Sequence, residues 1–244
     1  MVYKAFASVY HALMPENLYD EWLDYMKLFT PDLQGKTIVD LGCGTGDLAQ
    51  RLSDEGARVI ALDASEDMLA IARRETEGSI SYLKGDMRDL SILPKADQIV
   101  SFCDSLCYLL EDDDWQKVFQ QVYQKLKLGG WWHFDCHSLA HIEDFDGFIY
   151  REETDDWDLF WESELGQDYH VIHHLTLYHK EGDLTYRRYD EDHEEKTYPP
   201  EQIVQWLHEA GFDEVYSSSD FNKAPIDSEG AERLFFSCRK GEEK

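Results

Sequence analysis

Basic residues are scarce in this sequence. Its 244 residues include 23 Lys and Arg against 51 Asp and Glu, which gives a formal net charge of −28 at pH 7. A field of this sign opposes association with polyanions, and no local cluster of basic residues offsets it. We therefore expect neither a nucleic acid nor an anionic membrane surface as a partner. The acidic surplus otherwise favours solubility.

Long apolar runs are also missing. No stretch approaches the ~18 consecutive apolar residues that a transmembrane helix requires. The N-terminus lacks the basic segment and apolar core of a secretory signal peptide. We expect a cytoplasmic protein. With 43% hydrophobic and 14% aromatic residues, the chain has enough apolar material for one sizeable core.

Cysteines are few and scattered, at positions 43, 103, 107, 136 and 238. This spacing forms no disulfide framework and is typical of reduced thiols in a cytoplasmic protein. Cys103 and Cys107 are close in sequence, but no second pair follows at zinc-finger spacing. We therefore expect no metal site.

A glycine-rich turn at 42–46 organises the chain. The β-branched and apolar run Thr37–Leu41 predicts a buried strand, and Leu48–Leu52 resumes at helical spacing. The turn lacks the Lys-Ser/Thr pair of a phosphate-binding P-loop. It also lacks the third glycine of a dinucleotide fingerprint, because Asp47 occupies that position. Asp40 and Asp47 would both repel a pyrophosphate, so a neutral or cationic ligand fits this turn better.

The stretch Val39-Asp40-Leu41-Gly42-Cys43-Gly44-Thr45-Gly46 closely resembles the first motif of the class I S-adenosylmethionine (SAM) dependent methyltransferases. SAM carries an ammonium and a sulfonium and no phosphate, which agrees with the charge of the turn. The resemblance implies an α/β fold, with a doubly wound, mostly parallel seven-stranded sheet that has one antiparallel strand and is flanked by helices. It also implies SAM-dependent methyl transfer, with a cofactor site that includes Asp40, Gly42, Cys43, Gly44 and Gly46.

Asp63 ends the next predicted strand, Arg58–Asp63, about 20 residues after the glycine turn. An acid at this position can accept both hydroxyls of a ribose in charge-assisted hydrogen bonds. NAD-binding folds place an acid in the same way, so Asp63 indicates a ribose rather than SAM in particular. Ala64 and Met68 follow it in the predicted cofactor site, and Ser65 is the expected cap of the next helix.

Two more acids follow predicted strands. The resemblance implies that Asp86 accepts the adenine amino group, with the backbone of Met87 against the ring. It places Asp104 and Ser105, which follow the strand Gln98–Cys103, beside the transferred methyl. Doubly wound folds bind ligands at the carboxyl ends of their strands. Acids at four successive strand ends are therefore a more specific signal than any one of them.

The chain begins with two predicted amphipathic helices on either side of Pro15. Tyr3, Phe6 and Tyr10 recur there at helical spacing, and ordinary core packing would explain them equally well. In the resembling family an N-terminal aromatic segment folds over the bound SAM. Tyr10 is accordingly the expected capping residue.

The later core elements also follow the family pattern. A helix is predicted over Asp112–Leu128, ending at Gly129-Gly130, and is followed by a strand at Trp131–Asp135. A second helix starts at Pro199-Pro200 and closes at Gly211, its expected C-cap. Two last strands are predicted at 215–217 and 234–238, and residues after Gly241 are expected to fray.

Between these elements, residues 148–198 depart from the minimal family pattern. Their aromatic strands and the turns at 166–167 and 181–183 predict an antiparallel sheet, the last strand of which starts at Leu184. The segment holds 15 acids and 5 bases, and five of the ten histidines. We interpret it as an inserted lid on the acceptor site, dividing the chain into a SAM-binding domain (1–147 and 199–244) and an insert (148–198). Its strand histidines, including His170, His173, His174 and His179, are interpreted as plain sheet residues.

The acceptor is expected to be a small molecule, with an amine or another N or O nucleophile. Charge supports this, as does the absence of two sequence motifs: the Asn/Asp-Pro-Pro-aromatic motif of nucleic acid amino-methyltransferases and the Pro-Cys pair of cytosine C5 enzymes. His137 and Tyr10 are candidates for removing a proton. Two alternatives stay open, an NAD-dependent oxidoreductase and a non-catalytic SAM-binding module. No feature of the sequence indicates an oligomeric state.

Overall fold

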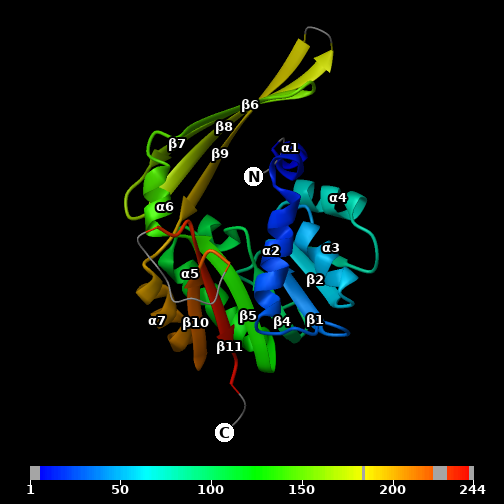
Figure 1. Ribbon diagram of the computed structural model, residues 1–244, viewed down its shortest axis with the longest axis vertical. Coiled ribbons are helices and arrows are strands. Elements are labelled where there is room, and N and C mark those ends of the chain that lie inside the picture. The colour runs from blue at the N-terminus through cyan, green and yellow to red at the C-terminus, as the bar shows by residue number, and fades with distance from the viewer. Residues whose placement is uncertain (1–5, 183–184, 222–229, 242–244) are drawn as a thin grey trace.

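The computed structural model describes residues 6–182, 185–221 and 230–241 (Figure 1). The helices are α1 (Ala7–Leu13), α2 (Glu16–Lys27), α3 (Asp47–Asp54), α4 (Glu66–Glu75), α5 (Asp112–Lys125), α6 (Leu139–Asp144) and α7 (Pro200–Ala210), with a 3-10 turn η1 (Ser105–Tyr108). None of these helices is long and apolar enough to cross a bilayer.

A seven-stranded sheet forms the centre of the fold. Its strands are β1 (Thr37–Leu41), β2 (Arg58–Asp63), β3 (Ser81–Lys84), β4 (Ala96–Ser101), β5 (Leu126–His137), β10 (Glu214–Ser219) and β11 (Arg233–Arg239). They lie in the order β10-β11-β5-β4-β1-β2-β3. The pairs from β5 through β3 are all parallel, whereas β11 runs antiparallel to both β5 and β10. The expected doubly wound sheet with one antiparallel strand is confirmed.

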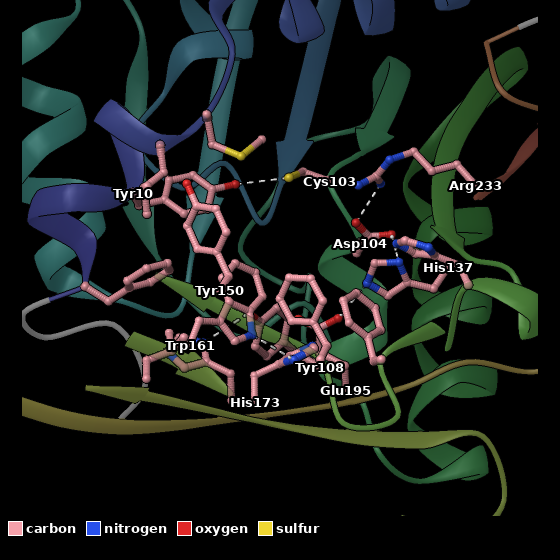
Figure 2. A pocket seen from close by; sticks show the side chains of 18 of the residues that line it. Tyr10, Cys103, Asp104, Tyr108, His137, Tyr150, Trp161, His173, Glu195 and Arg233 are labelled. Atoms are coloured by element: carbon pink, nitrogen blue, oxygen red, sulfur yellow. Dashed lines mark hydrogen bonds and ion pairs between the residues drawn. The ribbon is translucent and has the colours of Figure 1, made fainter. Parts of the chain in front are cut away.

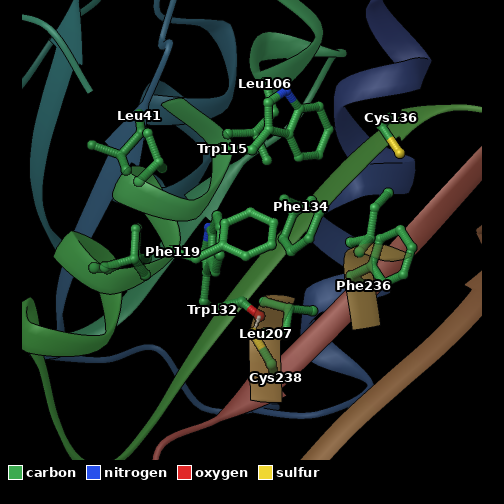
Figure 3. Close-up of a cluster of buried hydrophobic side chains, with 14 of the residues drawn as sticks. Leu41, Leu106, Trp115, Phe119, Trp132, Phe134, Cys136, Leu207, Phe236 and Cys238 are labelled. Atoms are coloured by element: carbon green, nitrogen blue, oxygen red, sulfur yellow. Dashed lines mark hydrogen bonds between the residues drawn. The ribbon is translucent and has the colours of Figure 1, made fainter. Parts of the chain in front are cut away.

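Both faces of this sheet are buried, which explains why its strands read as continuous apolar runs. Because side chains alternate along a strand, Ile38 belongs to a buried cluster with residues of α2, α3 and α4, while Val39 belongs to one with residues of α5, η1 and α7. On the second face, Trp115 and Phe119 of α5 lie over the aromatic side chains of β5 (Figure 3). Phe119 meets Trp132 edge-on at 5.1 Å between ring centroids.

A second, antiparallel sheet is built from β6 (Ile149–Glu153), β7 (Trp157–Leu165), β8 (His170–Gly182) and β9 (Thr185–Lys196), in that order. One end of it lies beside α6, and the other projects past α1, away from the large sheet (Figure 1). Its inner face packs on α1, where Phe6 and Val9 meet Leu159, Leu175 and Leu177. The four strands fall within 148–198, and the division of the chain into two domains at those boundaries stays a prediction.

Most predicted elements are present, including the two N-terminal helices, the Ser65 cap and the left-handed Gly211 that ends α7. The predicted helix Asp112–Leu128 is wrong at its end, because α5 stops at Lys125 and Leu126 already pairs with Ala96 of β4. Sequence reasoning also missed β6 and α6. Tyr3, Leu184 and the residues after Gly241 lie outside the described part of the chain.

Gly129 and Gly130 lie within β5 rather than at a helix end. The strand makes an irregular step here, and Gly129 takes φ +74°. A Cβ on Gly130 would lie 2.9 Å from the backbone oxygens of Asp97 and Lys127. The glycine pair therefore permits a close backbone approach, which is a second use of glycine that the pattern alone does not distinguish from a C-cap.

The aromatic cluster on β5 gives a test of the fold. Phe134 is fully buried and stacks on Phe236 with centroids 5.0 Å apart. We expect Phe134→Ala to lower the free energy of unfolding by about 3–5 kcal/mol, because it leaves a cavity in a packed core. Leu128→Ala, on the same strand but 54% exposed, is the matched control and should change it by at most about 0.5 kcal/mol. Equal effects in denaturant titrations would contradict this assignment of the core.

Candidate active site

The glycine turn lies where the strand order reverses, between β1 and β4, the usual ligand position in a doubly wound sheet. Gly42, Gly44 and Gly46 all have positive φ. A Cβ on Gly42 would lie 2.5 Å from the Ser105 hydroxyl, and one on Gly46 would lie 2.5 Å from the Tyr82 hydroxyl. A Cβ on Gly44 would meet no atom within 4 Å. Gly44 thus exposes its backbone to open space.

That space is a cavity of about 300 Å³, here called the first cavity. It is lined by Tyr10, Gly42, Gly44, Asp63, Ala64, Ser65, Met68, Met87, Cys103, Ser105 and Tyr108. Most of the predicted cofactor residues therefore lie around one opening. The predicted residues Asp40 and Cys43 line a small pocket of about 30 Å³ next to it, together with Tyr19 and Trp22. None of these described lining residues is Lys or Arg.

Asp63 fixes the glycine turn as well as lining the first cavity. Its Oδ2 accepts a hydrogen bond from the Gly44 backbone N–H at 2.9 Å, and its Oδ1 accepts one from Ser65 N–H at 2.7 Å. Burial raises the pKa of this carboxyl above its usual value, and the backbone donors oppose that shift. Replacing Asp63 would thus disturb the loop in addition to any contact with a ribose.

Asp40 is a buried carboxyl with an open acceptor. It is 2% exposed, and its Oδ2 has no hydrogen-bond partner among the described residues. Burial, and then the negative charge of Asp63, raise the pKa of Asp40 to about 7. The charged form of a buried carboxyl group whose pKa is raised in this way is stabilised by an adjacent cation.

Asp86 is placed differently from its neighbour Met87. Met87 lines the first cavity. Asp86 points to Arg88, which donates to both of its carboxylate oxygens at 2.6–3.0 Å and lowers its pKa. The structure therefore does not bring Asp86 to the cavity wall, and its contact with adenine stays a prediction.

A second cavity, of about 400 Å³, lies between the large sheet and the antiparallel sheet (Figure 2). Tyr10, Cys103 and Tyr108 line both cavities, which therefore meet at these three side chains. The Tyr10 hydroxyl lies 3.0 Å from Cys103 Sγ. Tyr10 thus reaches the expected position over the first cavity, and its role as a cap or a base stays a prediction.

A buried ion cluster forms the floor of the second cavity. Arg233 Nη1, from the start of β11, lies 2.6 Å from Asp104 Oδ2 and 2.9 Å from Asp135 Oδ2. Asp135 also accepts hydrogen bonds from the Asp104 backbone N–H and the Trp22 indole. These contacts hold Cys103 and Asp104 in left-handed backbone conformations, φ 57° and 56°, immediately after β4.

His137 lies at the end of β5 between two carboxylates. Its Nε2 is 2.9 Å from Glu195 Oε2, and its Nδ1 is 3.5 Å from Asp104 Oδ1. Burial alone would lower the pKa of His137, but Asp104 and Glu195 outweigh it and raise the pKa. His137 in turn outweighs the effect of burial on Glu195 and lowers its pKa to about 2.

The antiparallel sheet supplies the opposite wall of the second cavity, including Phe148, Tyr150, Trp161 and Leu175. His173, interpreted from the sequence as a plain sheet residue, also lines it and accepts a hydrogen bond from the Trp161 indole. Burial lowers the pKa of His173 to about 4. His170, His174 and His179 do not line the cavity.

Sequence reasoning missed Tyr108, Glu195, Arg233 and Asp135. An acid inside the apolar run 131–136 and an arginine before the apolar run 234–236 were available signals, because charged residues are rarely buried without a partner. Glu195 carried no such signal, since it stands among other acids.

Comparisons with known proteins agree with this geometry. Residues 38–130 match the family model of a methyltransferase domain. A Geobacillus protein (strain WCH70), provisionally named a methyltransferase, is 39% identical over 98% of this chain and all of its own length. The chain belongs to the SAM-dependent methyltransferases.

Two solved structures share the fold of this methyltransferase. A SAM-dependent methyltransferase from Clostridium acetobutylicum is 26% identical, with a TM-score of 0.83 over 97% of this chain and 98% of its own. The sugar N-methyltransferase KedS8 from Streptoalloteichus has a TM-score of 0.82 over 99% of this chain and 95% of its own; at 18% identity it shows the shared fold. The alternatives of an NAD-dependent oxidoreductase and of a non-catalytic module are thereby set aside.

The residues present fit SAM, which supplies an electrophilic methyl group on a sulfonium. The Oδ2 of Asp40, which has no hydrogen-bond partner among the described residues, suits a cationic ligand, and the open space at Gly44 admits one against the backbone. The absence of Lys and Arg from the described cavity walls disfavours a pyrophosphate. Gly42, Gly44, Asp63 and Met87 are the residues that would hold SAM.

We expect Gly44→Ala to weaken SAM binding at least about tenfold, because the added methyl enters space that the ligand needs. Gly35→Ala is the matched control. Gly35 also has positive φ and no atom within 4 Å of its would-be Cβ, but it lies before β1, away from the cavities. Both variants carry the same backbone strain, so equal losses of affinity in calorimetry would argue against this placement.

The pKa of Asp40 gives a pH test. Because this carboxyl is neutral below about 7, SAM affinity should rise with pH through that value, by up to about tenfold per unit on the acid side. Asp40→Asn should flatten the rise, while Asp54→Asn, exposed at the end of α3, should leave it intact. An unchanged slope in Asp40→Asn would exclude Asp40 as its source.

Proposed function

We propose that the methyltransferase methylates a small molecule at an amine nitrogen. The observation that carries this proposal is the junction of the two cavities at Tyr10, Cys103 and Tyr108. A methyl donor held in the first cavity faces the second one there. The volume of about 400 Å³ is that of a typical small-molecule site.

The walls of the second cavity support an acceptor with an apolar body. The antiparallel sheet contributes Phe148, Tyr150 and Trp161, and none of the described residues of 148–198 lines the first cavity. We propose that the insert shapes the acceptor site. Its influence extends further through α1, because the sheet packs on the helix that carries Tyr10.

Charge supports an amine over an acidic acceptor. Asp104 and Glu195 are buried in the wall of the second cavity, and the insert carries 15 acids against 5 bases. This field favours a cation and disfavours a carboxylate. KedS8, which shares the fold, is named for N-methylation of a sugar.

The chain's own contribution to such a reaction is positioning and water exclusion. Apolar and aromatic side chains close the junction, and Tyr10 is held there by its contact with Cys103. Aligned reactants in a dry site account for much of the rate of such a transfer. Since an amine attacks only after losing a proton, turnover should rise with pH towards the pKa of the acceptor.

The test uses SAM with a deuterated methyl group and a cell extract, and label is measured separately in its small molecules and its macromolecules. We expect a labelled product in the untreated extract and its loss when the amines of the extract are first blocked by acetylation. The Gly44→Ala and Gly35→Ala variants serve as the inactive and active controls.

A labelled product that persists after acetylation would indicate an oxygen or carbon acceptor and overturn the amine assignment. Label that appears only in macromolecules would overturn the small-molecule assignment.

A further inference from the structure

Asp104 and His137 both line the second cavity, and each has one buried polar atom, Oδ1 and Nδ1, without a hydrogen-bond partner among the described residues. They are 3.5 Å apart, and their side chains are 9% and 8% exposed. They belong to the ends of β4 and β5, adjacent parallel strands. Asp104 directly follows Cys103, which lines both cavities, so the two atoms lie near the junction.

The other polar atom of each side chain is bound by a neighbouring charged residue (Figure 2). Asp104 Oδ2 is bound by Arg233 Nη1, and Arg233 is anchored in turn by Asp135. His137 Nε2 is bound by Glu195 Oε2 from the last strand of the insert. Each residue therefore keeps one acceptor-capable atom in a set direction, buried in the wall of the cavity next to the other.

This arrangement selects for a group with several donors. A neutral His137 that donates Nε2–H to Glu195 leaves a lone pair on Nδ1, beside the negative Asp104 Oδ1. Two buried acceptors side by side are unfavourable unless a donor lies between them, either the Nδ1–H of the imidazolium or, once His137 is neutral, an N–H of the ligand. An ammonium has three N–H donors and a positive charge and satisfies both, whereas a hydroxyl has one donor and a carboxylate none.

We propose that Asp104 Oδ1 and His137 Nδ1 form the subsite for the acceptor's amino group, with Asp104 holding an N–H and His137 taking the proton. The proposal rests on the amine acceptor proposed above. In this step one N–H bond of the ammonium breaks, its electron pair stays on nitrogen as the attacking lone pair, and the proton forms the Nδ1–H bond of an imidazolium. Glu195 is a positioning residue that directs Nδ1 towards Asp104 Oδ1.

The charges around His137 set the pH at which it accepts a proton. Asp104 and Glu195 favour the imidazolium, whereas burial, Arg233, His141 and His173 oppose it. The carboxylates prevail and raise the pKa of His137. His137 must therefore lose its proton before it can act, and the rate should rise with pH through its pKa.

The first experiment follows the histidine ring signals by NMR in protein saturated with S-adenosylhomocysteine, titrated with cyclohexylamine or cyclohexanol. We expect the amine to shift the His137 signals and to lower its pKa by about one unit or more, because a bound cation destabilises the imidazolium. Cyclohexanol should do neither. No shift of His137 at about 100 mM amine, which would fill even a site with a Kd near 10 mM, overturns the proposal.

The second experiment uses variants. Asp104→Asn should weaken the amine's effect on His137 at least about tenfold, since it removes a charged acceptor. Asp192→Asn is the matched control. It removes a carboxylate whose Oδ1 lies 2.7 Å from His174 Nδ1, in an exposed pair on the insert. It should lower the pKa of His174, which Asp192 raises, and leave amine binding unchanged. Equal amine binding in both variants contradicts the subsite.

Glu195→Gln tests positioning separately. It removes a charge that favours the imidazolium but keeps an oxygen that can accept the hydrogen bond from His137 Nε2–H. The acid limb of the pH profile of kcat/KM should therefore move to lower pH. An unmoved limb excludes this role. His137→Gln serves if Asp104→Asn is too unstable to purify: it should abolish the pH-dependent limb, and a surviving limb contradicts the proposal.

The two proposals fail in different ways. If an amine binds at His137 but no labelled amine product forms, the subsite is supported and the proposed function is contradicted. If a labelled amine product forms and the KM for the amine acceptor is the same in Asp104→Asn and Asp192→Asn, the proposed function stands and the subsite is wrong.

Discussion

The site depends on one buried guanidinium. Arg233 begins the strand that runs against its neighbours in the large sheet, and it reaches the two acids at the ends of β4 and β5. Burying three charges is costly, and the attraction between them offsets that cost only when their geometry is good. The contribution of Arg233 is therefore orientation more than stability. It determines which oxygen of Asp104 remains beside His137 without a hydrogen-bond partner among the described residues.

The central fold was predictable because its signals are local. Strand, glycine turn and helix succeed one another within a few residues, and a doubly wound topology then brings the strand ends to one edge. Asp40, Asp63 and Asp104 could be placed at that edge for this reason. Met87 and Asp86, adjacent in sequence, show the limit: the pattern locates the strand end, but the neighbouring Arg88 decides where the carboxylate points.

The acceptor side was less predictable because it is assembled from distant segments. Glu195 and His137 are 58 residues apart, and Arg233 and Asp135 are 98 apart. No periodicity links such positions. His173 was assigned to the sheet correctly, but its place in the wall of the second cavity was not predicted, since alternation indicates which face a side chain shares and not whether that face meets a cavity. The predicted end of the helix that in fact stops at Lys125 was wrong for a related reason, because glycine occurs both at helix ends and at close backbone contacts.

The packing of α1 has a consequence for how this enzyme could acquire new substrates. Phe6 and Val9 lie on the inner face of the insert, and Tyr10, one turn on from Phe6, lines both cavities. We therefore expect a volume change at Leu159, Leu175 or Leu177 to shift the helix that borders the first cavity. Mutations that change acceptor preference on these strands are then expected to change SAM affinity as well. Laboratory evolution of this enzyme should accordingly randomise α1 and the inner strands together, since neither surface can adapt independently.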